Sequence, residues 1–159
     1  MSFYNKNDII EMAIKIEKRG YTFYNEASKK NNLDTNTKDL FIQLRDEETK
    51  HEETFRNLRD KLDIINIKNE FNWDEERKYI ESIINEQLFD SPDKVIQLAK
   101  NAKNAKALID LAIDFEKETL HYFQSINRYI TERKAKTALE EIINEEISHI
   151  QRLNEFKIL

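Results

Sequence analysis

Two glutamate–histidine pairs lie where a helix would otherwise be apolar. Between residues 38 and 62, a pattern alternating by three and four residues predicts one inward face of a helix. Glu48 and His51 stand at its centre. The other members of this face are Phe41, Leu44, Phe55, Leu58 and Leu62. A carboxylate and an imidazole three residues apart on an inward face can bind the same metal ion.

The pattern is duplicated along the chain. Glu146 and His149 follow the first pair by 98 residues. They again interrupt an apolar stripe, formed by Leu139, Ile142, Leu153 and Phe156. Glu17 lies on the apolar face of a helix predicted over residues 7–30, and Glu116 follows it by 99 residues, on a helix predicted over 104–131. Each half therefore carries Glu on one helix and Glu-x-x-His on the next.

These six side chains predict a metal centre. They are Glu17, Glu48, His51, Glu116, Glu146 and His149. Four carboxylates in a dry core are unstable unless their charge is compensated, and two divalent cations supply that charge. Carboxylates with one histidine per metal suit iron or manganese, and zinc by affinity. The set is typical of carboxylate-bridged di-iron bundles.

Other polar residues have simpler interpretations. Glu118 and His121 form a third Glu-x-x-His, but they point away from the apolar face of their helix, so we assign them to solvent. The remaining glutamates beside the pairs are predicted to be solvated: Glu47, Glu52, Glu53 and Glu145.

Tyr24 is a catalytic candidate. It lies two turns from Glu17 on the same helix face, so its hydroxyl could hydrogen-bond a metal ligand or pass an electron. A packed core tyrosine is the alternative, and Tyr122 is a weaker case of the same kind.

Composition predicts one all-α domain over residues 1–159. The chain has one Gly, one Pro and 36% charged residues, which is typical of long helices with few turns. The absence of Cys excludes disulfides and thiolate ligands. The net charge of −5, with Lys and Glu interleaved, argues against a nucleic-acid partner. No apolar run suits a membrane span or a signal peptide, so we expect a cytoplasmic protein without a membrane partner.

The long connection between the halves predicts a four-helix bundle with a crossover. Residues 63–103 include a short helical pattern over 74–88 and a second helix start at Ser91, followed by Pro92. A connection of this length can carry the chain from one end of a bundle to the other, joining two helix hairpins.

Four segments resemble the rubrerythrin-like branch of the ferritin superfamily. They are AIKIEK at 13–18, DEETKH at 46–51, AIDFEK at 112–117 and EEISH at 145–149. The resemblance spans nearly the whole chain and implies a ferritin-like four-helix bundle with a non-haem di-iron centre. It also implies that Glu48 and Glu146 bridge the two irons. Glu17 and His51 would then complete one iron site, and Glu116 and His149 the other.

The chain departs from the family pattern in two ways. Typical rubrerythrins carry a cysteine-rich rubredoxin domain, which is absent here, so an external electron donor is expected. They also place a further Glu one turn after the third-helix ligand, where this chain has Thr119. Bacterioferritins share the six ligand types, but Thr49 stands in place of their haem-binding Met, and only ten residues follow His149. Neither haem nor cage storage is expected.

The expected function is that of a non-haem di-iron oxidoreductase. It would reduce hydrogen peroxide, dioxygen or both while oxidising Fe(II), with Glu48, Glu146 and Tyr24 as catalytic candidates. The alternatives are an iron-binding or delivery protein without turnover and a dimanganese, catalase-like enzyme. A homodimer is expected from the family resemblance.

Overall fold

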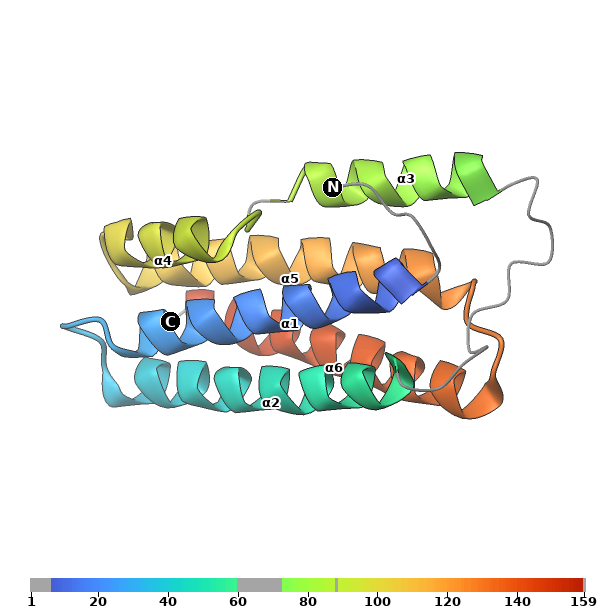
Figure 1. Cartoon of the computed structure of the whole chain (residues 1–159). Helices are drawn as coiled ribbons and strands as arrows, with labels where there is room; N and C mark the ends of the chain where they lie inside the picture. Colours follow the sequence, from blue (N-terminus) through green and yellow to red (C-terminus); the bar gives the residue numbers. More distant parts are fainter. Residues whose placement is uncertain (1–6, 60–72, 88, 159) are drawn as a thin grey trace.

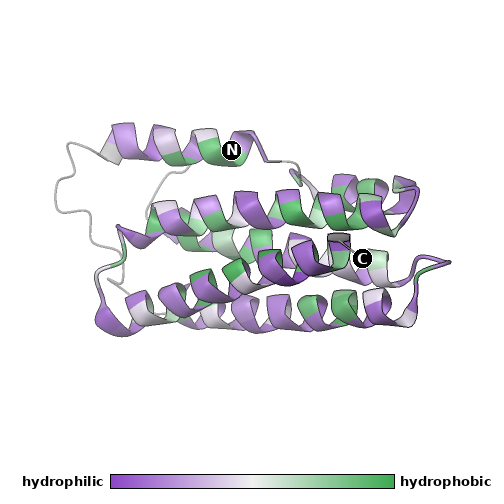
Figure 2. Cartoon of the chain, turned by 180° about the vertical axis from the view of Figure 1, so that it is seen from behind, coloured by the Kyte–Doolittle hydropathy of each residue, from purple (hydrophilic) through white to green (hydrophobic). Residues whose placement is uncertain are grey.

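Four long helices form the bundle predicted from the sequence. The computed structural model describes residues 7–59, 73–87 and 89–158, and within these ranges the secondary structure is helical. The long helices are α1 (Asn7–Ser28), α2 (Thr35–Arg59), α5 (Ala105–Asn127) and α6 (Arg133–Ile158). They lie side by side with their axes nearly parallel (Figure 1). Hydrophilic and hydrophobic residues alternate along each of these helices (Figure 2), and the buried hydrophobic residues form the core.

The helices form two hairpins whose connecting loops lie at opposite ends of the bundle (Figure 1). In the first loop, Asn32 has φ 69°, a left-handed conformation that Asn tolerates better than most residues. Asp34 then caps α2, accepting hydrogen bonds from the Thr37 amide at 2.7 Å and the Thr37 hydroxyl at 3.1 Å. In the second loop, Glu132 caps α6 by accepting from the Ala135 amide at 2.7 Å.

Two short helices lie in the described part of the crossover. They are α3 (Trp73–Asn85) and α4 (Pro92–Asn101). Ser91 caps α4 as predicted, its hydroxyl accepting from the Lys94 amide. The two helices take the chain along the bundle from one end to the other (Figure 1).

Some predicted boundaries and faces were wrong. Helix α1 ends at Ser28, and α5 ends at Asn127, where Tyr129 and Ile130 turn back with i−3 hydrogen bonds. The three-and-four spacing predicts that Tyr21 lies on the inner face of α1, but Tyr21 is 40% exposed. The same spacing predicts that Tyr79 lies on the apolar face of α3, but Tyr79 is 47% exposed. The predicted ends of the second helix at Leu62 and of the crossover helix at Leu88 lie outside the described residues.

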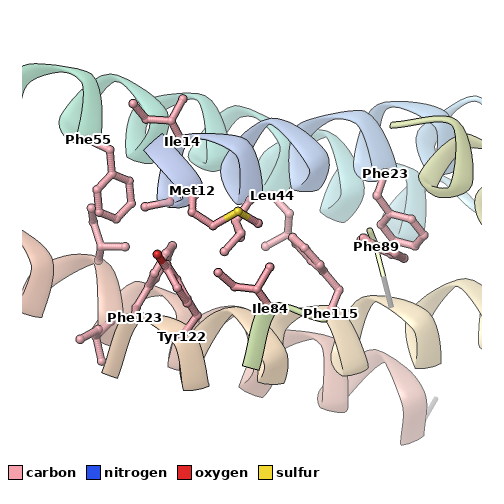
Figure 3. Close-up of a cluster of buried hydrophobic side chains, with 14 of the residues drawn as sticks. Met12, Ile14, Phe23, Leu44, Phe55, Ile84, Phe89, Phe115, Tyr122 and Phe123 are labelled. Carbon is pink, nitrogen blue, oxygen red and sulfur yellow. The ribbon is translucent and has the colours of Figure 1, made fainter. Parts of the chain in front are cut away.

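An aromatic residue of the crossover is part of the core. Phe89, between α3 and α4, packs between Phe23 of α1 and Phe115 of α5. The centroid of the Phe89 ring lies 5.0 Å from that of Phe23 and 4.6 Å from that of Phe115. Figure 3 shows the three rings in the core. The Phe89 carbonyl also accepts a hydrogen bond from the Arg19 guanidinium at 3.1 Å. The crossover is therefore packed into the bundle and holds α1 against α5.

Tyr122 is a structural residue, so Tyr122→Phe should lower the free energy of unfolding by about 1–2 kcal/mol. Its buried hydroxyl donates to the carbonyl of Ile9 at 2.8 Å and ties α5 to α1. Urea unfolding measures the change. The control is Tyr21→Phe, at an exposed tyrosine, which should change stability by less than about 0.5 kcal/mol. Equal effects of the two substitutions would contradict this role.

Candidate metal centre

The bundle brings all six predicted ligands to one place. Each comes from a long helix, because the three-and-four spacing that predicts an inward face also directs these side chains inward. Their exposed fractions are between 0 and 2%. The six side chains are Glu17 on α1, Glu48 and His51 on α2, Glu116 on α5, and Glu146 and His149 on α6.

The six side chains form two sets of four. One set consists of Glu17, Glu48, His51 and Glu146. The other consists of Glu48, Glu116, Glu146 and His149. Within each set, one potential ligand atom per residue lies within 4.8 Å of the others. Glu48 and Glu146 belong to both sets and so stand between the two candidate metal positions.

The histidines present their Nδ1 atoms to the carboxylates. His51 Nδ1 lies 2.9 Å from Glu146 Oε1 and 3.5 Å from Glu17 Oε2. His149 Nδ1 lies 3.0 Å from Glu146 Oε2 and 3.2 Å from Glu116 Oε1. The two rings are nearly parallel, with centroids 5.6 Å apart. One imidazole is thus available to each position.

The carboxylates lack enough hydrogen-bond donors. Among the described residues, both oxygens of Glu17, both of Glu48 and one of Glu116 are buried without a hydrogen-bond partner. Buried acceptors are normally satisfied, so these oxygens indicate a missing positive ligand. Carboxylate and imidazole donors in this number fit two divalent cations.

Burial and mutual repulsion change the protonation of the site. Burial, followed by neighbouring carboxylates, raises the pKa of Glu17, Glu48 and Glu116 well above the ordinary value. Burial also acts to raise the pKa of Glu146, but hydrogen bonds with His149 and His51 outweigh it and lower that pKa. In the metal-free protein, bound protons therefore replace part of the missing positive charge.

The pKa values of the two histidines are both raised. Burial acts to lower the pKa of His51, but its hydrogen bond and charge interaction with Glu146 outweigh burial and raise it to about 9. Burial is likewise outweighed at His149, where Glu116 raises the pKa. Both imidazoles therefore tend to hold a second proton when no metal is bound.

Two glutamates that sequence reasoning assigned to solvent contact the outer side of the histidines. Glu47 Oε2 lies 2.8 Å from His149 Nε2, and Glu145 Oε2 lies 2.5 Å from His51 Nε2. Glu145 is 59% exposed, but Glu47 is half-buried, and the hydrogen bond with His149 lowers its pKa to about 2. Outer carboxylates of this kind orient a histidine and make its other nitrogen a better metal ligand.

A signal for these outer glutamates was present in the sequence. Each directly precedes a predicted bridging glutamate, and the doublet recurs with the same offset of 98 residues as the ligands. By contrast, Glu53 and His121 are exposed as predicted, and Glu52 pairs with Arg56 on its own helix.

Tyr24 contacts a candidate ligand directly. Its buried hydroxyl donates to Glu116 Oε1 at 2.5 Å. Burial, together with the nearby Glu116 and Glu48 carboxylates, raises the pKa of the phenol well above its ordinary value. The phenol therefore remains protonated and able to donate.

Gly20 provides the space that Glu48 occupies. A Cβ atom at this position would lie 2.5 Å from Glu48 Oε2 and 3.0 Å from the Phe115 ring. The position is one turn after Glu17, on the same inward face of α1. Helical periodicity places Gly20 on this face but does not indicate that Glu48 fills the space beside it.

Together the fold and site define a ferritin-like helical bundle with a candidate carboxylate–histidine metal centre. The rubrerythrin family model matches residues 8–157, and the chain belongs to the rubrerythrin family. A Thermotoga maritima protein described as a ferritin-like diiron-carboxylate protein has a similar fold, with a TM-score of 0.72 and 24% sequence identity. The match covers 99% of this chain and 97% of that one.

No curated protein matches the chain significantly. None of the helices in the described ranges has the length and apolar character needed to span a membrane.

Gly20→Ala should weaken metal binding without unfolding the protein. The new methyl group displaces the Glu48 carboxylate from the centre, whereas Ala favours helix by about 1 kcal/mol over Gly. Equilibrium metal titration and thermal melting measure the two effects separately. Lys18→Ala, on the exposed face of α1, is the matched control and should leave binding unchanged. Unchanged binding in Gly20→Ala would contradict the role assigned to this space.

The metal-free protein should lose stability as the pH rises from 6 to 9. Three of the buried carboxylates and both histidines have raised pKa values, so in this range the folded state binds more protons than the unfolded chain, and rising pH favours unfolding. For His51 alone, a rise from 6.5 to about 9 corresponds to about 3 kcal/mol, present below pH 6.5 and lost by pH 9. The lowered pKa values of Glu47 and Glu146 change the free energy of unfolding only below about pH 4.5.

Urea unfolding with a chelator at pH 6, 7.5 and 9 measures this loss. The metal-loaded protein is the control, because metal replaces the protons and binds more tightly as the pH rises. Metal-free stability that stays constant or rises over this range would contradict the proposed protonation.

Proposed function

We propose that this protein is a non-haem di-iron oxidoreductase that oxidises Fe(II) with hydrogen peroxide, dioxygen or both. The observation that supports it best is the pair of buried ligand sets sharing two carboxylates. Membership of the rubrerythrin family supports the same class of protein. The iron identity, the oxidant and turnover itself are part of the proposal.

Each ligand has a proposed role. Glu48 and Glu146 would contribute to both metal positions, because both belong to both sets. Glu17 and His51 would complete one position, and Glu116 and His149 would complete the other. When bound, the metal pair supplies the two electrons that reduce one peroxide molecule to two waters, with two protons taken up.

The chain supplies binding, charge and orientation. Four carboxylates balance the charge of two divalent ions, and the absence of a side chain at Gly20 leaves the space that the Glu48 carboxylate occupies. Tyr24 holds Glu116 by a hydrogen bond and is the proposed route for an electron or a proton to that ligand. An external donor restores the electrons between turnovers, because the chain contains no cysteine for a rubredoxin-type iron site.

Metal-free protein titrated with ferrous iron under anaerobic conditions should saturate near two irons per chain. The loaded protein should also melt at a higher temperature than the metal-free protein, since ligand binding adds to the free energy of unfolding. His149→Ala should lose part of this binding. The control is His121→Ala, at the exposed histidine of α5, which should bind iron as the wild type does.

The reaction is then tested by mixing the ferrous protein separately with peroxide and with dioxygen. Rapid oxidation followed by repeated turnover with a reductant supports the oxidoreductase. A single oxidation without turnover would instead indicate an iron-binding or delivery protein. Oxygen release from peroxide by the manganese-loaded form would indicate a catalase-like enzyme. Without saturable metal binding, the di-iron proposal fails.

A further inference from the structure

The two ligand sets are supported differently, although the sequence is duplicated. Tyr24 donates a hydrogen bond to Glu116. Its counterpart in the repeat, 99 residues later, is Phe123, which has no hydroxyl group. Both oxygens of Glu17, the ligand equivalent to Glu116, have no hydrogen-bond partner among the described residues. Before metal binds, Glu116 is therefore held by a tyrosine hydrogen bond, whereas within the described residues Glu17 has only an ionic contact with His51 Nδ1 at 3.5 Å.

The outer carboxylates show the same difference. Arg152 Nη1 donates to both oxygens of Glu47, at 2.9 and 3.2 Å, and Arg152 Nη2 donates to Gln43 Oε1 at 3.0 Å. Glu47 is thus fixed where it contacts His149. The counterpart of Arg152, 98 residues earlier, is Thr54, which donates to a carbonyl of its own helix.

Among the described residues, Glu145, the counterpart of Glu47, forms one ion pair. Within the described residues its ion-pair partner is His51, and its side chain is 59% exposed. No arginine or lysine there restrains it as Arg152 restrains Glu47. The histidine of the first set is therefore oriented by a carboxylate that is itself free to move in solvent.

We propose that the two metal positions are unequal, and that the Glu116/His149 position binds its metal first and retains it while the Glu17/His51 position exchanges. The inference rests on the proposed two-metal centre and assigns different tasks to its halves. Ligands held before binding lose less conformational freedom when metal arrives. Outer partners of a metal-binding histidine typically change affinity by roughly 10–100-fold. Tyr24 and Arg152 act here as positioning residues.

Anaerobic calorimetric titration with ferrous iron tests the inequality. The wild type should show two steps of one metal per chain each, with affinities at least about tenfold apart. His51→Ala should remove the weaker step and His149→Ala the tighter one. This comparison locates each step without measuring activity.

Exchanging residues between equivalent positions of the repeat tests what causes the difference in affinity. Arg152→Thr should weaken the tighter step about tenfold and leave the weaker step unchanged, and Arg152→Lys should restore part of the loss. Thr54→Arg should strengthen the weaker step by placing a guanidinium near Glu145. Tyr24→Phe and Phe123→Tyr form a second reciprocal pair within the core. If the buried Phe123→Tyr change prevents folding, as thermal melting would show, Arg152→Thr and Thr54→Arg still test the cause of the difference in affinity.

The outcomes separate this inference from the proposed function. Two steps of equal affinity, or loss of the tighter step in His51→Ala, would overturn the inequality while retaining a two-metal centre. Effects of Arg152→Thr that are equal on both steps would overturn the assigned cause. No saturable iron binding by the wild type would remove both the centre and the inference.

Discussion

The balance of charge inside a dry bundle is the constraint on which this structure depends. Four carboxylates lie in the core in two overlapping sets, and isolated charges there are far more costly than at the surface. Protons can reduce that cost, and two divalent cations can remove most of it. The bundle is therefore stabilised by what its centre binds as well as by its apolar packing, and folding and metal loading are thermodynamically linked.

The fold and the six central residues followed from the sequence because both have local signatures. A polar residue that replaces an apolar one inside a helical stripe is conspicuous, and the repeat makes Glu48 and Glu146 each support the interpretation of the other. The predicted hairpins and crossover follow from helix lengths and the lengths of the connections. The structure places all six side chains in one compartment, and their roles as ligands remain a proposal.

The parts that could not be predicted depend on relations between helices. The contact of Glu47 with His149 joins α2 to α6, and helical periodicity on α2 alone places Glu47 beside solvent. The space that Gly20 leaves for Glu48 likewise depends on the distance between α1 and α2. The end of α5 at Asn127 is set by the turn of Tyr129 and Ile130 into the core, which a continuous apolar pattern conceals.

Glu146 belongs to both ligand sets, and this affects how the protein matures during synthesis. When the first hairpin leaves the ribosome it carries Glu17, Glu48 and His51, which are three of the four members of one set. Glu146 follows Glu48 by 98 residues, a delay of roughly 5–20 s at usual rates of translation. Until then neither set is complete, so under the proposed ligand assignment an incomplete chain would not retain metal as the finished bundle would. Metal retention would then require that both halves have been made and have docked.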